Sequence, residues 1–350
     1  MRELSLVVLF ILFAALFFIL MSLFLYLIIK KYMNNRIKQK IKDYKKDYYE
    51  DVFQFLQTGE QGLIQFDKQL EKFKAIIELL IEYSTVLDDS YVRMRISIFA
   101  KQHLTNYVKK ELRQRRWSLR MNALYLIEDF HMDNLVEILH ELYRKKRTTV
   151  AEKTQILKLL AKFDDEKIVK YVKTVSTQIS DFSLLTIMTS LEEEKFEVLI
   201  EEFDALPIRI KYIVVETIGR KQLFKHQNLL QRLVLQDEGE LRIRALKAYA
   251  TTGLPIDSNA IAGFFHSESW QIRLMVIKVA GVQRMDEYKE RLIELLSDRE
   301  YIVRAEAAKA ILRFKDGVSI LTVVTEDSND VFAKDMAIEW LEKERDGYSY

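Results

Sequence analysis

The sequence predicts an all-α protein in which one N-terminal transmembrane helix is followed by an α-solenoid of stacked helical hairpins. Three observations lead to this fold class. Nine glycines and two prolines in 350 residues are too few for a fold rich in turns or strands. An uncharged apolar run lies near the N-terminus, and one helical pattern returns along the rest of the chain about every 30 residues. The sequence contains no cysteine, which excludes disulfides and cysteine-based catalysis or metal binding.

The apolar run extends from Leu4 to Ile29 and predicts a transmembrane anchor at residues 1–30. A helix of these 26 residues would be ~39 Å long, enough to cross a hydrocarbon core of ~30 Å. A cleaved signal peptide is the alternative interpretation. Its apolar core would span roughly 7–15 residues and end at small residues, whereas Lys30 and Lys31 follow this run directly.

The charges that flank the run predict the orientation of the anchor. The charged residues before the run are Arg2 and Glu3. The segment after the run, up to residue 46, has Asp43 as its single carboxylate. The basic residues of that segment are Lys30, Lys31, Arg36, Lys38, Lys40, Lys42, Lys45 and Lys46. The positive-inside rule therefore predicts a single-pass plasma-membrane protein with its N-terminus outside and its solenoid in the cytoplasm. We take residues 31–60 as a basic juxtamembrane helix or linker, which either contacts lipid headgroups or serves as a topology signal only.

A repeated pattern predicts the solenoid at residues 61–346, with a tail at 347–350. The stretches LRIRALKAY, IRLMVIKVA and VRAEAAKAI place Arg242, Arg273 and Arg304 at intervals of 31 residues. Small or apolar residues follow each arginine at three, four, six and seven positions, which gives one apolar helical face. The same frame extends to Lys211 and Lys334 and, more weakly, to Arg93, Arg120, Lys153 and Asp181. A two-helix hairpin cannot bury such a face alone, so neighbouring hairpins must stack.

The best repeat resembles the signature of HEAT repeats in their short bacterial form. Asp298 is followed six positions later by Arg304, and then by Ala307, Ala308 and Ala310. The resemblance implies that the first helix of each pair lines the convex side, and that the Asp and Arg hydrogen-bond between neighbouring repeats. It assigns structural roles to Arg120, Arg242, Arg273, Asp298 and Arg304.

Other recurring residues are expected to be structural as well. Trp117, Trp270 and Tyr301 occupy one register of the first helices, where we expect core packing; an exposed ladder that stacks a ligand is the alternative. Lys247, Lys278 and Lys309 recur five positions after the arginines and predict a solvated face. Glycines 253, 281 and 317 are expected in the breaks between helices.

No catalytic constellation is evident in the sequence. The five histidines are scattered, and His140–Glu141 is a lone pair, whereas a resemblance to di-iron hydroxylases built on HEAT-like repeats would require several such pairs. We therefore predict that the protein is not an enzyme and has no metal site, no cofactor and no small-molecule substrate. The acidic stretch Leu191–Asp204 is expected to be a solvated face or a partner contact.

Two basic stretches form the candidate binding site. Lys109–Arg116 (KKELRQRR) and Arg144–Arg147 (RKKR) each precede a first helix and lie about one repeat apart, so stacking should place them on one edge. The predicted binding residues are Arg115, Arg116, Arg144, Lys145, Lys146 and Arg147. Their expected partner is an anionic membrane or protein surface, and a role in solubility only is the alternative.

These features favour a membrane-anchored cytoplasmic scaffold or adaptor of a bacterium. Its partner would be a membrane-associated protein, such as a cell-envelope synthase, glycosyltransferase or transporter. The alternative is a nucleic-acid-binding or base-modifying protein, since some DNA glycosylases are built on HEAT-like repeats. A net charge of +2, the acidic distal half and the anchor argue against nucleic acid as a partner.

Overall fold

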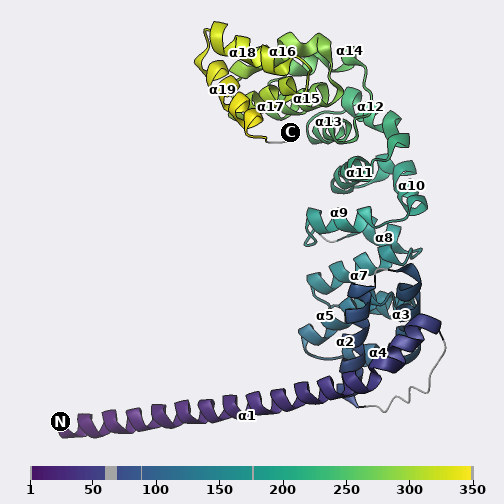
Figure 1. Cartoon of the computed structure of the whole chain (residues 1–350), viewed down its shortest axis with the longest axis vertical. Coiled ribbons are helices and arrows are strands. Elements are labelled where there is room, and N and C mark those ends of the chain that lie inside the picture. The colour runs from purple at the N-terminus through teal and green to yellow at the C-terminus, as the bar shows by residue number, and fades with distance from the viewer. Residues whose placement is uncertain (1, 60–68, 88, 176, 348–350) are drawn as a thin grey trace. The chain divides into compact units, whose positions relative to one another are not determined.

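The computed structural model describes residues 2–59, 69–87, 89–175 and 177–347, with side chains from Val8 onward. All regular elements of these residues are helices, which confirms the predicted all-α class (Figure 1). The chain divides into two compact units, Met1–Thr148 and Thr149–Tyr350. The predicted start of the solenoid at residue 61 and residues 348–350 of the predicted tail lie outside the described residues.

The elements follow one another in chain order. The first unit contains α1 (Arg2–Thr58), α2 (Leu70–Val86), α3 (Ser90–His103), α4 (Thr105–Leu112), α5 (Trp117–Asp129), η1 (Asp133–Leu135) and α6 (Val136–Arg144). The second unit contains α7 (Val150–Lys162), α8 (Ile168–Lys173), α9 (Asp181–Thr189), α10 (Glu193–Glu201), η2 (Phe203–Ala205), α11 (Ile208–Lys221), η3 (Phe224–His226), α12 (Gln227–Gln236), α13 (Glu240–Thr252), α14 (Ser258–Ile261), η4 (Ala262–His266), α15 (Trp270–Gln283), η5 (Asp286–Tyr288), α16 (Lys289–Glu294), η6 (Leu295–Ser297), α17 (Tyr301–Leu312), α18 (Gly317–Asp327) and α19 (Val331–Arg345).

Helix α1 joins the apolar run to the folded body without a break. It passes the predicted boundary at residue 30 as one continuous helix, because no glycine or proline interrupts it. It is long and apolar enough to cross a membrane, and 0% of its most apolar stretch is buried. Further along, its residues Val52, Phe55 and Leu56 are buried in the body. One helix therefore combines an exposed apolar segment with a packed end.

The second unit is a stack of helical hairpins. Its first helices α7, α9, α11, α13, α15, α17 and α19 each contact the next one in the series. They begin at residues 150, 181, 208, 240, 270, 301 and 331, which is the period of about 30 expected from the sequence. Lys153, Lys211, Arg273, Arg304 and Lys334 are each the fourth residue of their helix, and Arg242 is the third. Asp181 is the first residue of α9, so the expected frame is wrong there by three positions.

Small residues set the distance between successive first helices. A Cβ atom on Gly219 of α11 would lie 3.2 Å from the Cα atom of Ala248 in α13. A Cβ atom on Gly281 of α15 would lie 2.7 Å from the Cβ atom of Ala310 in α17. Gly281 thus lies inside α15 rather than in a break between helices, which corrects the sequence-based expectation. Its role is to allow two helices to approach closely.

This close approach is consistent with the curvature of the second unit. The row of first helices from α9 to α19 lies on the inner side of the curve, and α10, α12, α14, α16 and α18 lie on the outer side (Figure 1). The resemblance implied the opposite arrangement, with the first helices on the convex side. We attribute the inner position to the small residues, because closely spaced helices make their row the shorter one.

The repeated arginines bind backbone carbonyls of the turn that precedes their own helix. Arg304 donates to the carbonyl of Asp298 at 2.7 Å, and Arg273 donates to the carbonyl of Ser267 at 2.7 Å. In the first unit, Arg120 donates to the carbonyls of Gln114 and Arg115 at 3.0 and 2.8 Å. The last carbonyls of a helix have no hydrogen-bond partner within that helix. The arginines supply donors to such carbonyls at the ends of α4, η4 and η6.

One of these arginines also links neighbouring repeats. Arg273 forms a two-pronged ion pair with Asp298, with distances of 2.6 Å from Nε to Oδ2 and 2.8 Å from Nη2 to Oδ1. The exposed fractions of the two side chains are 7% and 6%. The carboxylate of Asp298 therefore pairs with the arginine of the preceding repeat, whereas Arg304 donates to the backbone carbonyls of Asp298 and Arg299. The signature Asp and Arg of one repeat thus have different partners.

The recurring aromatic residues are not core residues. The exposed fractions of Trp117 and Tyr301 are 49% and 55%, and Trp270 is half-buried. The prediction of core packing is wrong because these residues begin their helices. A residue on the apolar face of a helix points toward the neighbouring helix. It is buried only if that neighbouring helix is long enough to reach it. Helix α16, which packs against α17, has 6 residues.

Candidate functional site

The candidate site is a group of basic side chains in the first unit. We define the basic surface as Lys109, Lys110, Arg113, Arg115, Arg116, Arg144, Lys145, Lys146 and Arg147. The first two lie in the last turn of α4, and the following arginines lie at the turn between α4 and α5. Arg144 ends α6, and the others follow it directly. All of these side chains are exposed except Lys109, which is half-buried.

Two contacts align the hairpins that carry the basic surface. The side chain of Asn134 in η1 donates to the hydroxyl of Thr105, the first residue of α4, at 2.9 Å. Beside it, Lys101 forms an ion pair of 2.8 Å with Asp133. The starts of α4 and α6 are therefore aligned, and the two helices have similar lengths of 8 and 9 residues. That their basic C-terminal ends share one edge of the first unit stays a prediction.

The part of the basic surface on α4 surrounds an open hollow. Its volume is about 550 Å³, and its lining residues are Asn106, Lys109, Lys110, Arg113, Gln114 and Arg115. Among the residues that the structure describes, no carboxylate lines this hollow. The four residues from 144 to 147 do not line it, so the structure does not bring the two basic stretches together in one pocket.

Local structure explains how the turn displays its charges. Arg120 holds the carbonyls of Gln114 and Arg115, which fixes the backbone of the turn between α4 and α5. A structural explanation exists for part of the charge, because cations in the last turn of a helix interact favourably with the helix dipole, by about 0.3–1 kcal/mol. That explanation covers Lys109, Lys110 and Arg144, but not the arginines and lysines beyond the helix ends.

The basic surface differs from other charged regions in having no internal partners. Within the part of the chain that the structure describes, none of its nine side chains forms an ion pair or a hydrogen bond. The acidic stretch of the second unit is the opposite case. Glu193 pairs with Lys225, Glu202 pairs with Lys173, and Asp204 pairs with Arg232 at 2.9 Å. Its carboxylates therefore serve contacts between repeats, whereas the cations of the basic surface remain available to an external anion.

The predicted membrane-flanking residues lie on α1 in front of the body. They are Lys30, Lys31, Arg36, Lys38 and Lys40, and all of them are exposed. The ammonium group of Lys30 lies 5.6 Å from the ring centre of Tyr26 one turn earlier. Such an arrangement is suited to an interface, since a lysine stem can lie along apolar surface while its charge stays in water.

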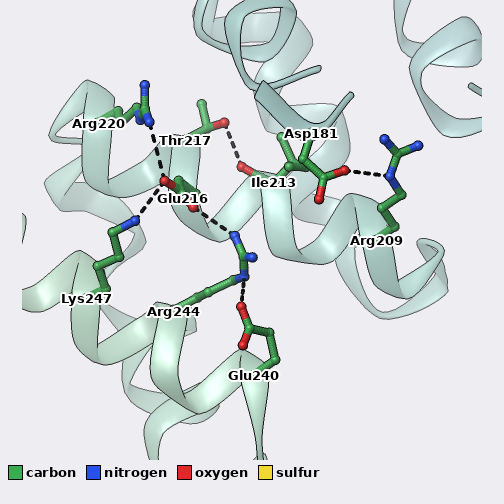
Figure 2. A network of polar contacts seen from close by, with 9 residues as sticks. All are labelled: Asp181, Arg209, Ile213, Glu216, Thr217, Arg220, Glu240, Arg244 and Lys247. Carbon is green, nitrogen blue, oxygen red and sulfur yellow. Dashed lines mark hydrogen bonds and ion pairs between the residues drawn. The ribbon is translucent and has the colours of Figure 1, made fainter. Parts of the chain in front are cut away.

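A second charged hollow lies in the second unit, between α11 and α13 (Figure 2). Glu216 binds Arg244 at 2.8 Å and Lys247 at 2.9 Å, and Arg220 lies 3.5 Å away. Burial raises the pKa of the Glu216 carboxyl, but the three cations outweigh this effect and hold it below its ordinary value. Arg244 also binds Glu240 at 2.6 Å. The carboxylates of Glu216 and Glu240 thus neutralise these cations, and the cluster links adjacent repeats.

Only part of this link could be expected from the sequence. Lys247 belongs to the predicted solvated row, and it is indeed exposed, but it also bridges two helices. Lys278 of the same row lies 3.9 Å from Glu306, and Lys309 lies 4.9 Å from the ring centre of Trp340. The sequence carried a signal for the two carboxylate pairs. Glu216 lies five positions after Lys211, and Glu306 lies two positions after Arg304, on first helices next to those of the lysines.

Comparison with known proteins identifies no family for this chain. No protein family and no curated protein sequence matches the chain. Among solved structures, the chain is similar to human deoxyhypusine hydroxylase in complex with glycerol, at 15% identity and a TM-score of 0.29, over 70% of this chain and 98% of that one. A likeness at this level carries no assignment of function.

One sequence-based expectation nevertheless requires correction. We predicted that the protein is not an enzyme, and the structural neighbour is an enzyme. That prediction is therefore contradicted, and we withdraw it. The described residues contain no group of three or more His, Asp or Glu side chains that could hold a metal ion. His140 is buried and its neighbour Glu141 is exposed, so this pair does not converge on one site.

Proposed function

We propose that the protein is a membrane-anchored scaffold of HEAT-like repeats that holds a protein partner near the cytoplasmic face of the plasma membrane. The observation that carries this proposal is the continuity of α1. Its apolar side chains are exposed over the stretch from Val8 to Ile29, with exposed fractions such as 71% for Phe10. Exposed apolar surface of this extent is stable in a bilayer and not in water.

The orientation of the proposed anchor rests on its charges. Five exposed cations between Lys30 and Lys40 precede the first carboxylate after the apolar run, Asp43. A positive excess on this scale holds the body on the cytoplasmic side. The partner is then restricted to proteins in or beside the membrane, since the anchor cannot leave it.

The binding role rests on the solenoid and on the basic surface. Stacked hairpins provide extended surfaces rather than one enclosed pocket, and such surfaces suit protein partners. The nine cations of the basic surface have no ion-pair partner among the residues that the structure describes, and they favour a partner with an acidic surface, because complementary charges speed association and suppress wrong partners.

Two reporter fusions test the topology. A reporter that is active only outside the cytoplasm should be inactive when it is fused after Tyr350, and active when it is fused before Met1. Each fusion is the matched control of the other. Activity at the C-terminal position would contradict the orientation, and inactivity at both positions would contradict a spanning helix.

Site-specific crosslinking tests the scaffold role. A photoreactive residue at Gln114, inside the hollow of the basic surface, should capture a membrane-associated protein in intact cells. The same residue at Lys170, which is exposed on α8 of the second unit, is the matched control. Equal capture at the two positions would contradict binding through the basic surface.

A further inference from the structure

The position of α4 relative to the bilayer follows from contacts within the first unit. The hydroxyl of Tyr44 on α1 donates to the Gln69 side chain at 3.0 Å, and Lys72 lies 5.3 Å from the Tyr44 ring centre. Next to Lys72, Phe73 stacks on Tyr107 of α4 with ring centres 5.2 Å apart. These contacts tie α4 to α1 at the level of Tyr44.

The distance along α1 from the end of the apolar run to Tyr44 gives the height of Tyr44 above the membrane. The apolar run ends at Ile29, and the side chains that follow on α1 are exposed or half-buried until Ile41. From Lys30 to Tyr44 the helix rises ~21 Å at 1.5 Å per residue. An ordinary tilt of ~20° from the membrane normal reduces this height only slightly. Tyr107, which precedes the α4 part of the basic surface by two positions, is therefore held about 20 Å from the bilayer by a helix.

Salt screening decides what the basic surface can attract at this height. The Debye length is about 8 Å at ~0.15 M salt, so a headgroup potential falls more than tenfold over ~20 Å. The cations of α1 between Lys30 and Lys40 lie much closer and remain within the field of the headgroups. The two groups of cations therefore face different partners.

The chemistry of the hollow indicates the kind of ligand. Lys109, Lys110, Arg113 and Arg115 line it together with two side-chain amides, and no carboxylate of the described ranges pairs with them. Arginine binds a carboxylate through two parallel N–H···O bonds, which gives geometric specificity as well as energy. The open shape and a volume of about 550 Å³ fit an extended segment rather than an enclosed small molecule.

We propose that the basic surface binds an Asp- and Glu-rich segment of a protein partner about 20 Å above the bilayer, and that it does not bind lipid headgroups. This inference rests on the proposed function, because it requires that α1 spans the membrane. The headgroups are bound instead by the cations that follow the apolar run on α1.

Lysine footprinting on the full chain distinguishes the two ligands. The chain is placed in nanodiscs of phosphatidylcholine alone or with phosphatidylglycerol added, and a poly-glutamate peptide serves as the acidic segment. The peptide should protect Lys109 and Lys110 from acetylation in both kinds of disc. Phosphatidylglycerol without peptide should protect Lys30, Lys31 and Lys38 but leave Lys109 and Lys110 reactive.

Charge reversal with a matched control tests the specificity of the peptide. Arg113→Glu with Arg115→Glu should weaken peptide binding, followed by fluorescence anisotropy, by about tenfold or more. Lys170→Glu with Lys315→Glu changes the net charge equally at exposed sites of the second unit and should change the affinity less than about twofold.

Each contrary result overturns a different statement. Protection of Lys109 and Lys110 by phosphatidylglycerol alone would make the headgroups the ligand of the basic surface. Equal weakening by the two reversals, or tighter binding of a single-stranded oligonucleotide than of the peptide, would reject the acidic protein segment. Failure of the chain to enter nanodiscs would instead reject the membrane anchor of the proposed function.

Discussion

Removal of the Arg273 side chain should open the junction between α15 and α17. Arg273→Ala leaves the carboxylate of Asp298, whose side chain is 6% exposed, without its cation. It also removes the hydrogen bonds to the carbonyls of Ser267 and Glu268, at 2.7 and 3.1 Å. Breaking a buried ion pair by removal of one partner costs about 3–5 kcal/mol.

Arg304→Ala is the matched comparison, because Arg304 is the fourth residue of α17 as Arg273 is of α15. It is half-buried, donates to the carbonyls of Asp298 and Arg299 at 2.7 and 3.3 Å, and lies 4.8 Å from the Phe332 ring centre. No carboxylate pairs with it among the described residues. A hydrogen bond that involves one charged group contributes about 1.5–3 kcal/mol. Arg273→Ala loses equivalent bonds to carbonyls and also strands a buried carboxylate, so removal of Arg304 should be the milder change.

Hydrogen exchange of the full chain measures both effects locally, which suits a stack in which each repeat contacts only its neighbours. A cost of 3–5 kcal/mol corresponds to a loss of protection in α15 and α17 of roughly a hundredfold to a few thousandfold. The double variant Arg273→Ala with Asp298→Ala should lose less than the sum of the single variants, because the second change removes the stranded carboxylate. Equal losses for Arg273→Ala and Arg304→Ala, or additive effects in the double variant, would refute the assigned pairing.

Two further changes should act on the same junction. Gly281→Ala places a Cβ atom 2.7 Å from that of Ala310 and should destabilise the junction by about 1–3 kcal/mol through overpacking. Gly263→Ala is its control, because a Cβ atom there meets nothing within 4 Å. Equal hydrogen-exchange rates for the two variants would contradict the close approach of α15 and α17. Burial raises the pKa of Asp298, but hydrogen bonds from Arg273 and the Glu300 N–H outweigh it and hold the pKa below the ordinary 3.8. The stability from this carboxylate should therefore be complete above pH ~4 and decrease as the pH falls through the folded-state pKa. Circular dichroism in acidic buffers measures it, and Asp298→Asn should lack this acid-dependent component.

Sequence patterns predicted the elements and much of their register. An apolar run of 26 residues and a period of about 30 residues are properties of neighbouring positions, so they can be recognised without a structure. For the same reason, Arg242, Arg273 and Arg304 could be aligned at intervals of 31 residues before their places in the helices were known. The frame failed at Asp181, where no basic residue marks the helix start and only the apolar face remained as a guide.

The candidate site was predictable in position but not in character. Sequence alone located the basic stretches, and it also located the acidic stretch from Leu191 to Asp204 as an equally charged region. Whether a charge is free or neutralised depends on side chains about one repeat away, such as Arg232, which lies 28 positions after its partner Asp204. Pairs at that separation are determined by the way in which helices stack.

The sequence by itself determined that this protein is helical and repetitive and that it has one long apolar helix, because these features follow from local composition and period. The tertiary structure decided that Asp298 pairs with Arg273 of the preceding repeat, that the first helices of the second unit form the inner row, and that Trp117 and Tyr301 are exposed. It also decided that the cations around the α4 hollow pair with no carboxylate in the described part of the chain. The physical reason is the same in each case: burial and charge neutralisation depend on which surfaces meet when hairpins pack, and the order of residues along one helix does not specify its neighbour's surface.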